Sequence, residues 1–234
     1  MGKLLKTILK VVGGIMVLLL LFYGFLYVTY NDDLPNGIQG SAADALANKM
    51  LVALNNDAYQ ETNYLEWTYR RNQYQWYKND GLCKVVWKDF KVQLNFNNPN
   101  LSKAYIHNFE VHNEQADELI QKALNSFYND SFWLVAPFKV FDPGTERRLV
   151  EIDDKEALLV TFTQGGVTPG DSYLWLLEES GRPYAFRFWT SIVSIKGLEA
   201  SWDDWVTTES GVLLPGSHKI LFLSMSMGDV KATK

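Results

Sequence analysis

A long uncharged apolar run near the N-terminus constrains this chain more than any other feature of its sequence. The run extends from Val11 to Tyr30 and follows three lysines, Lys3, Lys6 and Lys10. Its twenty residues would form a helix about 30 Å long, which matches the hydrocarbon core of a bilayer. Because the lysines precede the run, we expect residues 1–30 to be a transmembrane anchor with the N-terminus in the cytoplasm.

A cleaved signal peptide is the alternative interpretation of this run. Signal peptides usually have an apolar region of about 7–15 residues, which is shorter than this one. The nearest cluster of small residues, Gly40 to Ala43, begins ten residues after the run. A lipoprotein anchor would need a cysteine just behind the run, but the single cysteine is Cys83. We therefore predict a single-pass protein of the inner (cytoplasmic) membrane with its C-terminal domain in the periplasm.

The remainder of the chain is predicted to form one acidic domain. Residues 31–40 (NDDLPNGIQG) are polar and contain proline and glycine, so they are typical of a linker, and residues 41–234 form the domain. Without the three anchor lysines, the chain has 19 basic residues against 27 acidic ones, a net charge of −8. An acidic surface with no basic stripe is unsuited to nucleic acid, so we expect no nucleic-acid partner.

Hydrophobic periodicity predicts an α+β fold rich in antiparallel strands. Apolar residues recur at helical spacing over residues 41–59 and 113–128. Between these two helices the apolar residues alternate, as from Leu65 to Tyr69 and from Phe90 to Phe96, and His107 falls on the apolar face of such a strand. Further strands are expected near 146–152, 157–163, 171–178, 184–195, 198–207 and 211–223. About ten strands, with two helices covering one side of the sheet, are the simplest arrangement.

No pattern of catalytic or metal-binding residues is visible in the sequence. The three histidines, His107, His112 and His218, lack the spacing of zinc ligands. The pairs Asp153-Asp154 and Asp203-Asp204 cannot act alone as glycosidase carboxylates, because neighbours on a strand point to opposite faces. The glycine-rich stretch 165–170 has no lysine and no following helix, so it is expected to be a loop rather than a phosphate-binding site. We predict no enzyme activity, no metal and no cofactor.

Aromatic residues are unusually frequent, at 14% of the chain with eight tryptophans. Many of them lie at alternate strand positions, where they can either fill a core or line an apolar pocket. Periodicity does not separate these two possibilities. The residues that we expect as candidates for lining a ligand pocket are Trp67, Tyr69, Trp76, Trp87, Trp133, Tyr173, Trp175, Phe186, Phe188 and Trp202.

The central segment Asp130–Lys139 (DSFWLVAPFK) resembles the "YWL..P.K" segment of LolA/LolB-like lipoprotein carriers, with Phe132 in place of the tyrosine. The order of helix, strands, helix and further strands over about residues 41–223 is similar as well. The stretches Asp142–Thr145 and 166–173 also resemble uncharacterised proteins grouped with these carriers. The resemblance implies an unclosed β-barrel with helices over its opening and an apolar cavity that holds acyl chains.

The expected function follows from the anchor and this resemblance together. A tethered domain cannot shuttle between membranes, so we expect a fixed, non-enzymatic protein that binds a lipid, an acylated protein or another apolar ligand. Two alternatives stay open. One is a carbohydrate-binding or carbohydrate-cleaving domain that uses exposed tryptophans and Asp204, and the other is a structural module of a cell-envelope complex.

Overall fold

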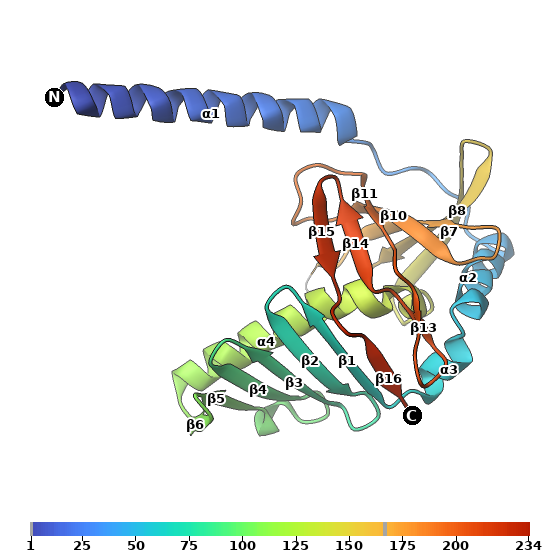
Figure 1. The fold of residues 1–234 in the computed structure, drawn as a ribbon. Coiled ribbons are helices and arrows are strands. Elements are labelled where there is room, and N and C mark those ends of the chain that lie inside the picture. The colour runs from blue at the N-terminus through green and yellow to red at the C-terminus, as the bar shows by residue number, and fades with distance from the viewer. Residues whose placement is uncertain (1, 166–167) are drawn as a thin grey trace.

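The N-terminal apolar run forms a long helix that precedes a β-rich domain (Figure 1). The structure is a computed structural model that describes residues 2–165 and 168–234. Helix α1 (Lys3–Tyr30) contains a 27-residue stretch, Leu4–Tyr30, that is long and apolar enough to cross a membrane. Its apolar side chains are exposed, and a signal sequence would meet the same criteria of length and composition.

The first antiparallel sheet is built mostly from consecutive hairpins. In the described part of the chain it has seven strands in the order β16-β1-β2-β3-β4-β5-β6 and is open at both edges. Its strands are β1 (Tyr64–Tyr69), β2 (Asn72–Tyr77), β3 (Leu82–Trp87), β4 (Phe90–Asn95), β5 (Lys103–Ile106), β6 (Phe109–Val111) and β16 (Lys231–Thr233). Alternate residues of β1 and β3 are buried, which confirms the period-two pattern in the sequence.

The second antiparallel sheet is formed by the C-terminal half of the chain. Within the described residues it also has seven strands, in the order β15-β14-β11-β10-β9-β8-β7, and it too is open. Its strands are β7 (Thr145–Ile152), β8 (Lys155–Phe162), β9 (Ser172–Leu177), β10 (Pro183–Trp189), β11 (Leu198–Ser201), β14 (Ser217–Ile220) and β15 (Leu223–Ser226). A short ribbon pairs β12 (Val206–Thr207) with β13 (Leu213–Leu214).

The two sheets meet along one edge. The chain passes from β15, at the edge of the second sheet, to β16, at the edge of the first, and the backbone N–H of Thr68 in β1 donates to the carbonyl of Met227 at 2.9 Å. The α+β class and the open antiparallel character are confirmed. The prediction of about ten strands in one sheet was wrong, because the described residues form sixteen shorter strands, fourteen of them in these two sheets.

The helices on the domain differ in extent from those expected. The helix predicted over 41–59 is broken into α2 (Ser41–Ala53) and α3 (Asn56–Glu61), because Asn55 takes a left-handed conformation and caps α3 with its side chain. Helix α4 runs over Glu114–Val135, seven residues beyond the predicted end, because Phe132 to Val135 continue its apolar face. A short 3₁₀ turn, η2 (Ala136–Lys139), follows.

These helices do not cover one side of a single sheet. Helix α2 packs on β7 and β8 of the second sheet, whereas α4 packs on β4 and β5 of the first. The Nε of Arg147 on β7 lies 2.6 Å from a carboxylate oxygen of Asp44 on α2, which fixes that helix in place. Helix α4 is long enough that its C-terminal half reaches the second sheet, where Phe132 contacts Tyr173 of β9.

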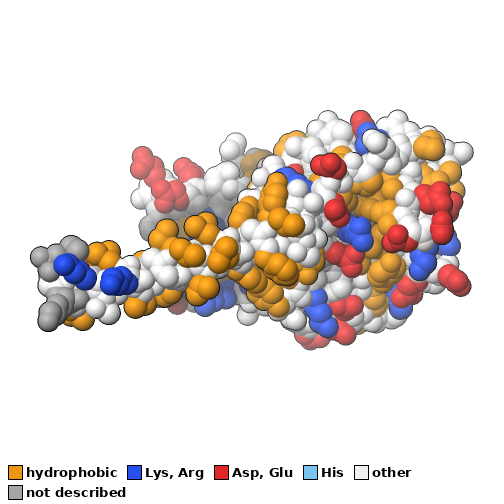
Figure 2. All heavy atoms as spheres, turned by 90° about the horizontal axis from the view of Figure 1, so that it is seen from above, with side chains coloured by type: hydrophobic (Ala, Val, Ile, Leu, Met, Phe, Trp, Pro, Cys, Tyr) orange, Lys and Arg blue, Asp and Glu red, His pale blue; other side chains and the backbone are white. Residues whose placement is uncertain are grey.

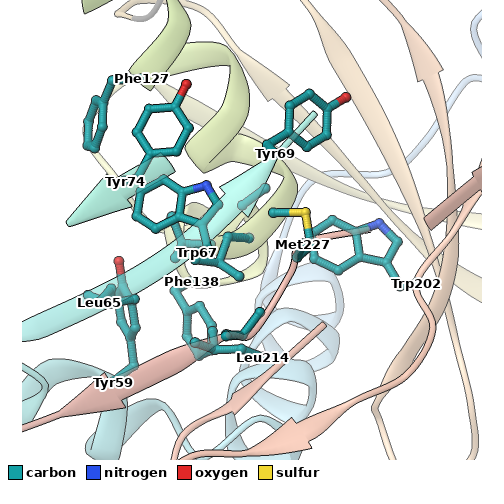
Figure 3. Packing of buried hydrophobic residues seen from close by; sticks show 14 of the residues in the cluster. Tyr59, Leu65, Trp67, Tyr69, Tyr74, Phe127, Phe138, Trp202, Leu214 and Met227 are labelled. Atoms are coloured by element: carbon teal, nitrogen blue, oxygen red, sulfur yellow. The ribbon is translucent and has the colours of Figure 1, made fainter. Parts of the chain in front are cut away.

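One large apolar core joins both sheets and the helices (Figure 3). Trp67 of β1 stacks on Tyr74 of β2 with ring centroids 4.6 Å apart, and Phe127 of α4 lies beside both. The thiol of Cys83 is buried in the same cluster, as expected for a small apolar residue. The core thus fills the space between α4 and the first sheet.

Residues 31–40 pack against the domain rather than spanning a free gap. The backbone of Asp32 donates to the carbonyl of Lys196 at 3.0 Å, and Ile38 forms an antiparallel bridge with Leu149 of β7. At Gly37 any side chain would meet Arg148, because an added Cβ would lie 2.7 Å from the Arg148 Cβ. The segment predicted as a linker is therefore bound to the second sheet at both of its ends.

Two further strand predictions need correction. His107 does not lie on the apolar face of a strand, because the chain reverses at His107-Asn108 between β5 and β6 and the His107 side chain is exposed near Asp89. The strand expected over 184–195 ends at Trp189, because residues 190–197 turn to meet the segment that follows α1. Tight turns connect β2 to β3 at residues 78–81 and β9 to β10 at residues 178–182.

Candidate functional site

A cavity of about 640 Å³ lies between the C-terminal half of α4 and the second sheet. Its lining comes from β1 and β2 of the first sheet, from α4 and the segment that follows it, and from β8, β9, β10, β14 and β15, together with the loops after β8 and β10. Its volume falls within the roughly 300–1,000 Å³ that is usual for small-molecule sites. The cavity is therefore large enough for an organic ligand and is partly open to the outside.

Aromatic rings form most of its apolar wall. Phe132 of α4 lies against Tyr173 of β9 with ring centroids 4.4 Å apart, and Trp133 lies 5.4 Å from Phe186 of β10. Tyr173 and Phe186 meet edge to face at 5.4 Å. These rings pack against one another, and the wall offers π faces and edges to an apolar ligand.

The inner end of the cavity carries a buried carboxylate. Asp130 of α4 accepts hydrogen bonds from Asn72 Nδ2, at 2.9 Å, and from the Tyr74 hydroxyl. Burial raises the pKa of Asp130 above its ordinary value, although these two donors and the nearby Arg70 act in the opposite direction. Asp130 is therefore held by the protein itself, and Arg70 lines the same cavity.

A second acidic group lies at the end where the loops meet. Asp171 accepts from the backbone N–H of Ser191 at 2.9 Å. Burial, followed by the nearby Asp171, raises the pKa of the Tyr173 hydroxyl. Lys139 pairs with Asp142 at 3.3 Å on the same rim. The cavity thus has an aromatic wall with polar groups at its ends, an arrangement suited to an apolar chain that bears a polar head.

Sequence comparison with models of known protein families and with curated proteins finds no match. The similarity of residues 130–139 to the carrier segment therefore stays a prediction, and the interpretation of the cavity depends on its geometry.

The candidate pocket residues from the sequence divide into two groups. Six of the ten line the cavity: Tyr69, Trp76, Trp133, Tyr173, Phe186 and Phe188. The other four, Trp67, Trp87, Trp175 and Trp202, do not line it and are buried in the core. Trp175 and Trp202, for example, pack on each other behind the cavity wall with ring centroids 5.1 Å apart.

Several cavity residues were missed by the sequence reasoning. Phe132 stands in the segment that resembles the carriers, and Phe162 is an alternating aromatic residue at the end of β8, so both had a usable signal. Met225 and Val193 had no usable signal in the sequence, because the side-chain direction of a single apolar residue in a short strand or loop cannot be predicted from the pattern. Asp130 is an acidic residue on the apolar face of α4, a pattern that can indicate a buried carboxylate.

The acidic pairs prove to be turn and bridge residues. Asp153 and Asp154 form the two-residue turn between β7 and β8, both with positive φ. Asp203 and Asp204 accept hydrogen bonds from Ser201 and Ser217, respectively. Among the described residues, no group of histidine, cysteine or acidic side chains is placed to hold a metal ion. The stretch 165–170 connects β8 to β9, but its residues 166 and 167 lie outside the described residues.

Proposed function

We propose that this protein binds a lipid, an acylated protein or another apolar ligand without chemical change, in the cavity between α4 and the second sheet. The observation that carries the proposal is the aromatic cavity of about 640 Å³. A filled interior would have favoured a purely structural module. Burial of an acyl chain would supply the driving force, at about 0.8 kcal/mol for each methylene.

The proposed location is the inner membrane, with the domain in the periplasm. No residue of the apolar window of helix α1 is buried, and most of its large apolar side chains are exposed, as in a span surrounded by lipid. The lysines at its N-terminal end favour a cytoplasmic N-terminus. A domain held at the outer face of that membrane would have acyl chains within reach.

The arrangement of the sheets supports the likeness to the LolA/LolB carriers. The two open sheets adjoin along β1, β15 and β16, so together they form a bent antiparallel wall, and α4 lies along its inner side (Figure 1). An unclosed barrel with a helix over its opening has this form. The segment that resembles the carriers places Phe132 and Trp133 on the cavity wall.

The carbohydrate alternative is less well supported by the placement of its residues. It requires tryptophans that present a ring face beside Asp204, but Trp202 is only 1% exposed and Trp205 stacks on it with ring centroids 5.9 Å apart. Asp204 is engaged with Ser217 on the outside of β14. No residue of the described cavity wall pairs with it.

Photo-crosslinking in a bilayer would test the proposal on the full chain. A diazirine-bearing fatty acid, added to the chain in phosphatidylcholine nanodiscs, should label peptides that carry Phe132 and Trp133 or Phe186 and Phe188. Labelling of α1 by the same probe reports its contact with lipid and serves as an internal reference. Labelling confined to α1 would overturn the cavity as a binding site.

A cavity-filling variant provides the matched control. Val193 lines the cavity from the loop after β10, so Val193→Trp should occupy space that about three methylenes would fill. The expected cost is about 2 kcal/mol, or roughly 30-fold weaker binding. It should be measured by competition with the crosslinking probe, and α1 labelling should stay unchanged. Equal cavity labelling in Val193→Trp and the parent chain would contradict the proposed site.

A further inference from the structure

The hairpin between β14 and β15 ends in an exposed apolar tip. Ile220 pairs with Leu223, so Leu221 and Phe222 form a two-residue turn. The exposed fractions are 39% for Leu221, 71% for Phe222 and 57% for Leu223. Hairpin tips in water usually carry polar residues and glycine.

The turn residues are also unfavourable for the backbone that they adopt. Leu221 has φ +53, a left-handed conformation that bulky side chains rarely take. Two-residue hairpin turns favour Asn-Gly or Asp-Gly, because these residues accept positive φ at little cost. A leucine and a phenylalanine at these positions therefore neither favour the turn conformation nor contribute buried surface to the core. Their exposure points to a partner outside the domain.

The tip lies beside the apolar helix. The rings of Phe22 and Phe222 have centroids 6.4 Å apart, and Leu26 packs against the domain core. Phe22 precedes the last residue of α1, Tyr30, by eight residues, a distance of about 12 Å along the helix axis. The tip is thus level with the apolar part of α1 rather than with its end.

The position of the tip along the axis of α1 is fixed by contacts between the domain and the segment that follows the helix. Directly after α1, Asn31 accepts from the backbone N–H of Lys196 at 2.9 Å, and the Trp189 indole donates to the carbonyl of Asp32 at 2.9 Å. These contacts leave little slack between helix and domain. Seen from the side on which α1 lies, apolar side chains cover the helix and continue onto the adjoining part of the domain (Figure 2).

We propose that the tip Leu221-Phe222-Leu223 inserts into the same membrane leaflet as the end of α1. This inference rests on the proposed anchoring by α1, but not on ligand binding. Ile192, which is 71% exposed and also lines the cavity, is a second candidate for contact with lipid. Ile220 and Met225 of the same hairpin line the cavity, so insertion would bring this part of the cavity wall close to the lipid acyl chains.

Spin labelling of the full chain in phosphatidylcholine nanodiscs would test the insertion. A nitroxide at Phe222→Cys should collide often with oxygen, which concentrates in lipid, and rarely with a water-soluble nickel complex. The matched control is Phe109→Cys, an exposed phenylalanine (78%) in β6 at the far edge of the first sheet. There the nickel complex should collide freely. The native Cys83 is buried and should not react with the label. Equal nickel access at both sites would overturn the inference.

A second variant separates insertion from folding. In a chain labelled at Leu223→Cys, the change Leu221→Asn with Phe222→Gly installs the preferred turn sequence, so the hairpin should form at least as well. Nickel access at residue 223 should rise several-fold, because the apolar tip is gone. Unchanged access would show that the tip does not insert. Extraction by alkaline carbonate is measured first, because release of the full chain from the membrane would contradict the anchoring by α1 itself and with it the insertion.

Discussion

Replacing Trp202 with alanine is expected to lower the free energy of unfolding by about 3–5 kcal/mol. Trp202 is 1% exposed and its ring lies 5.1 Å from Trp175 and 4.7 Å from His218. The truncation would leave a large void behind the cavity wall, where the sheet has little freedom to collapse. Urea unfolding of the full chain in detergent, followed by circular dichroism, would measure the loss.

Two further variants show whether the loss comes from packing. Trp202→Phe keeps a ring and removes an indole N–H that has no hydrogen-bond partner among the described residues, so it should cost much less. Tyr184→Ala, a truncation of an exposed ring on β10, should stay within about 0.5 kcal/mol of the parent. A Trp202→Ala chain that is as stable as Tyr184→Ala would mean that Trp202 is available for a ligand, as the carbohydrate alternative requires.

The alternation of apolar residues predicted the strands from β1 to β4 but not the turn between β5 and β6, nor how the strands divide into sheets. The hairpins from β1 to β4 are visible in their own residues, because side chains of a strand point alternately to its two faces. The division into two sheets depends on the pairing of β16 with β1, which lie at opposite ends of the domain sequence. A pairing of such long range leaves no local signal.

The same limit applies to the candidate pocket residues. Trp67 and Tyr69 follow the same alternation on β1 and point to the same side of the sheet. Trp67 meets Phe127 of α4 and is buried, whereas Tyr69 lies at the end of the strand, where it meets the cavity. Periodicity identifies the inner face of a sheet, but the position and length of the helix on that face decide which part of it stays open.

Acidification is expected to destabilise the domain through His218. This histidine is completely buried against Trp133 and Trp202, with Nδ1 2.9 Å from the carbonyl of Ser201. Burial lowers the pKa of His218 from 6.5 to about 4, although the hydrogen bond to Ser201 and the nearby Asp203 act in the opposite direction. Above pH 6.5 the imidazole is neutral in both the folded and the unfolded chain, so it does not affect stability there.

Below that pH the His218 imidazole is protonated in the unfolded chain but stays neutral in the folded chain until the pH nears 4. Stability should therefore fall as the pH is lowered from about 6.5 to about 4, by about 3 kcal/mol from this group alone. Asp130 contributes the opposite slope, because its raised pKa lets the folded chain hold a proton more readily than the unfolded chain. Glu66 adds to the loss, because hydrogen bonds, chiefly from Tyr64, lower its pKa in the folded chain, so the change measured by urea unfolding is a sum that the variants below separate.

A comparison of two histidine variants isolates this contribution. His218→Asn keeps a donor near the Ser201 carbonyl and has no group to protonate, so its stability should vary less between pH 6.5 and 4 than that of the parent. His107→Asn removes an exposed histidine from a turn and serves as the control. If His107→Asn flattened the profile as much as His218→Asn, the acid sensitivity would not come from the buried ring.

Trp133 packs on His218 and also lines the cavity, so protonation of His218 would loosen the cavity wall. Labelling by the diazirine fatty acid should therefore decrease over the same pH range in the parent chain but not in His218→Asn.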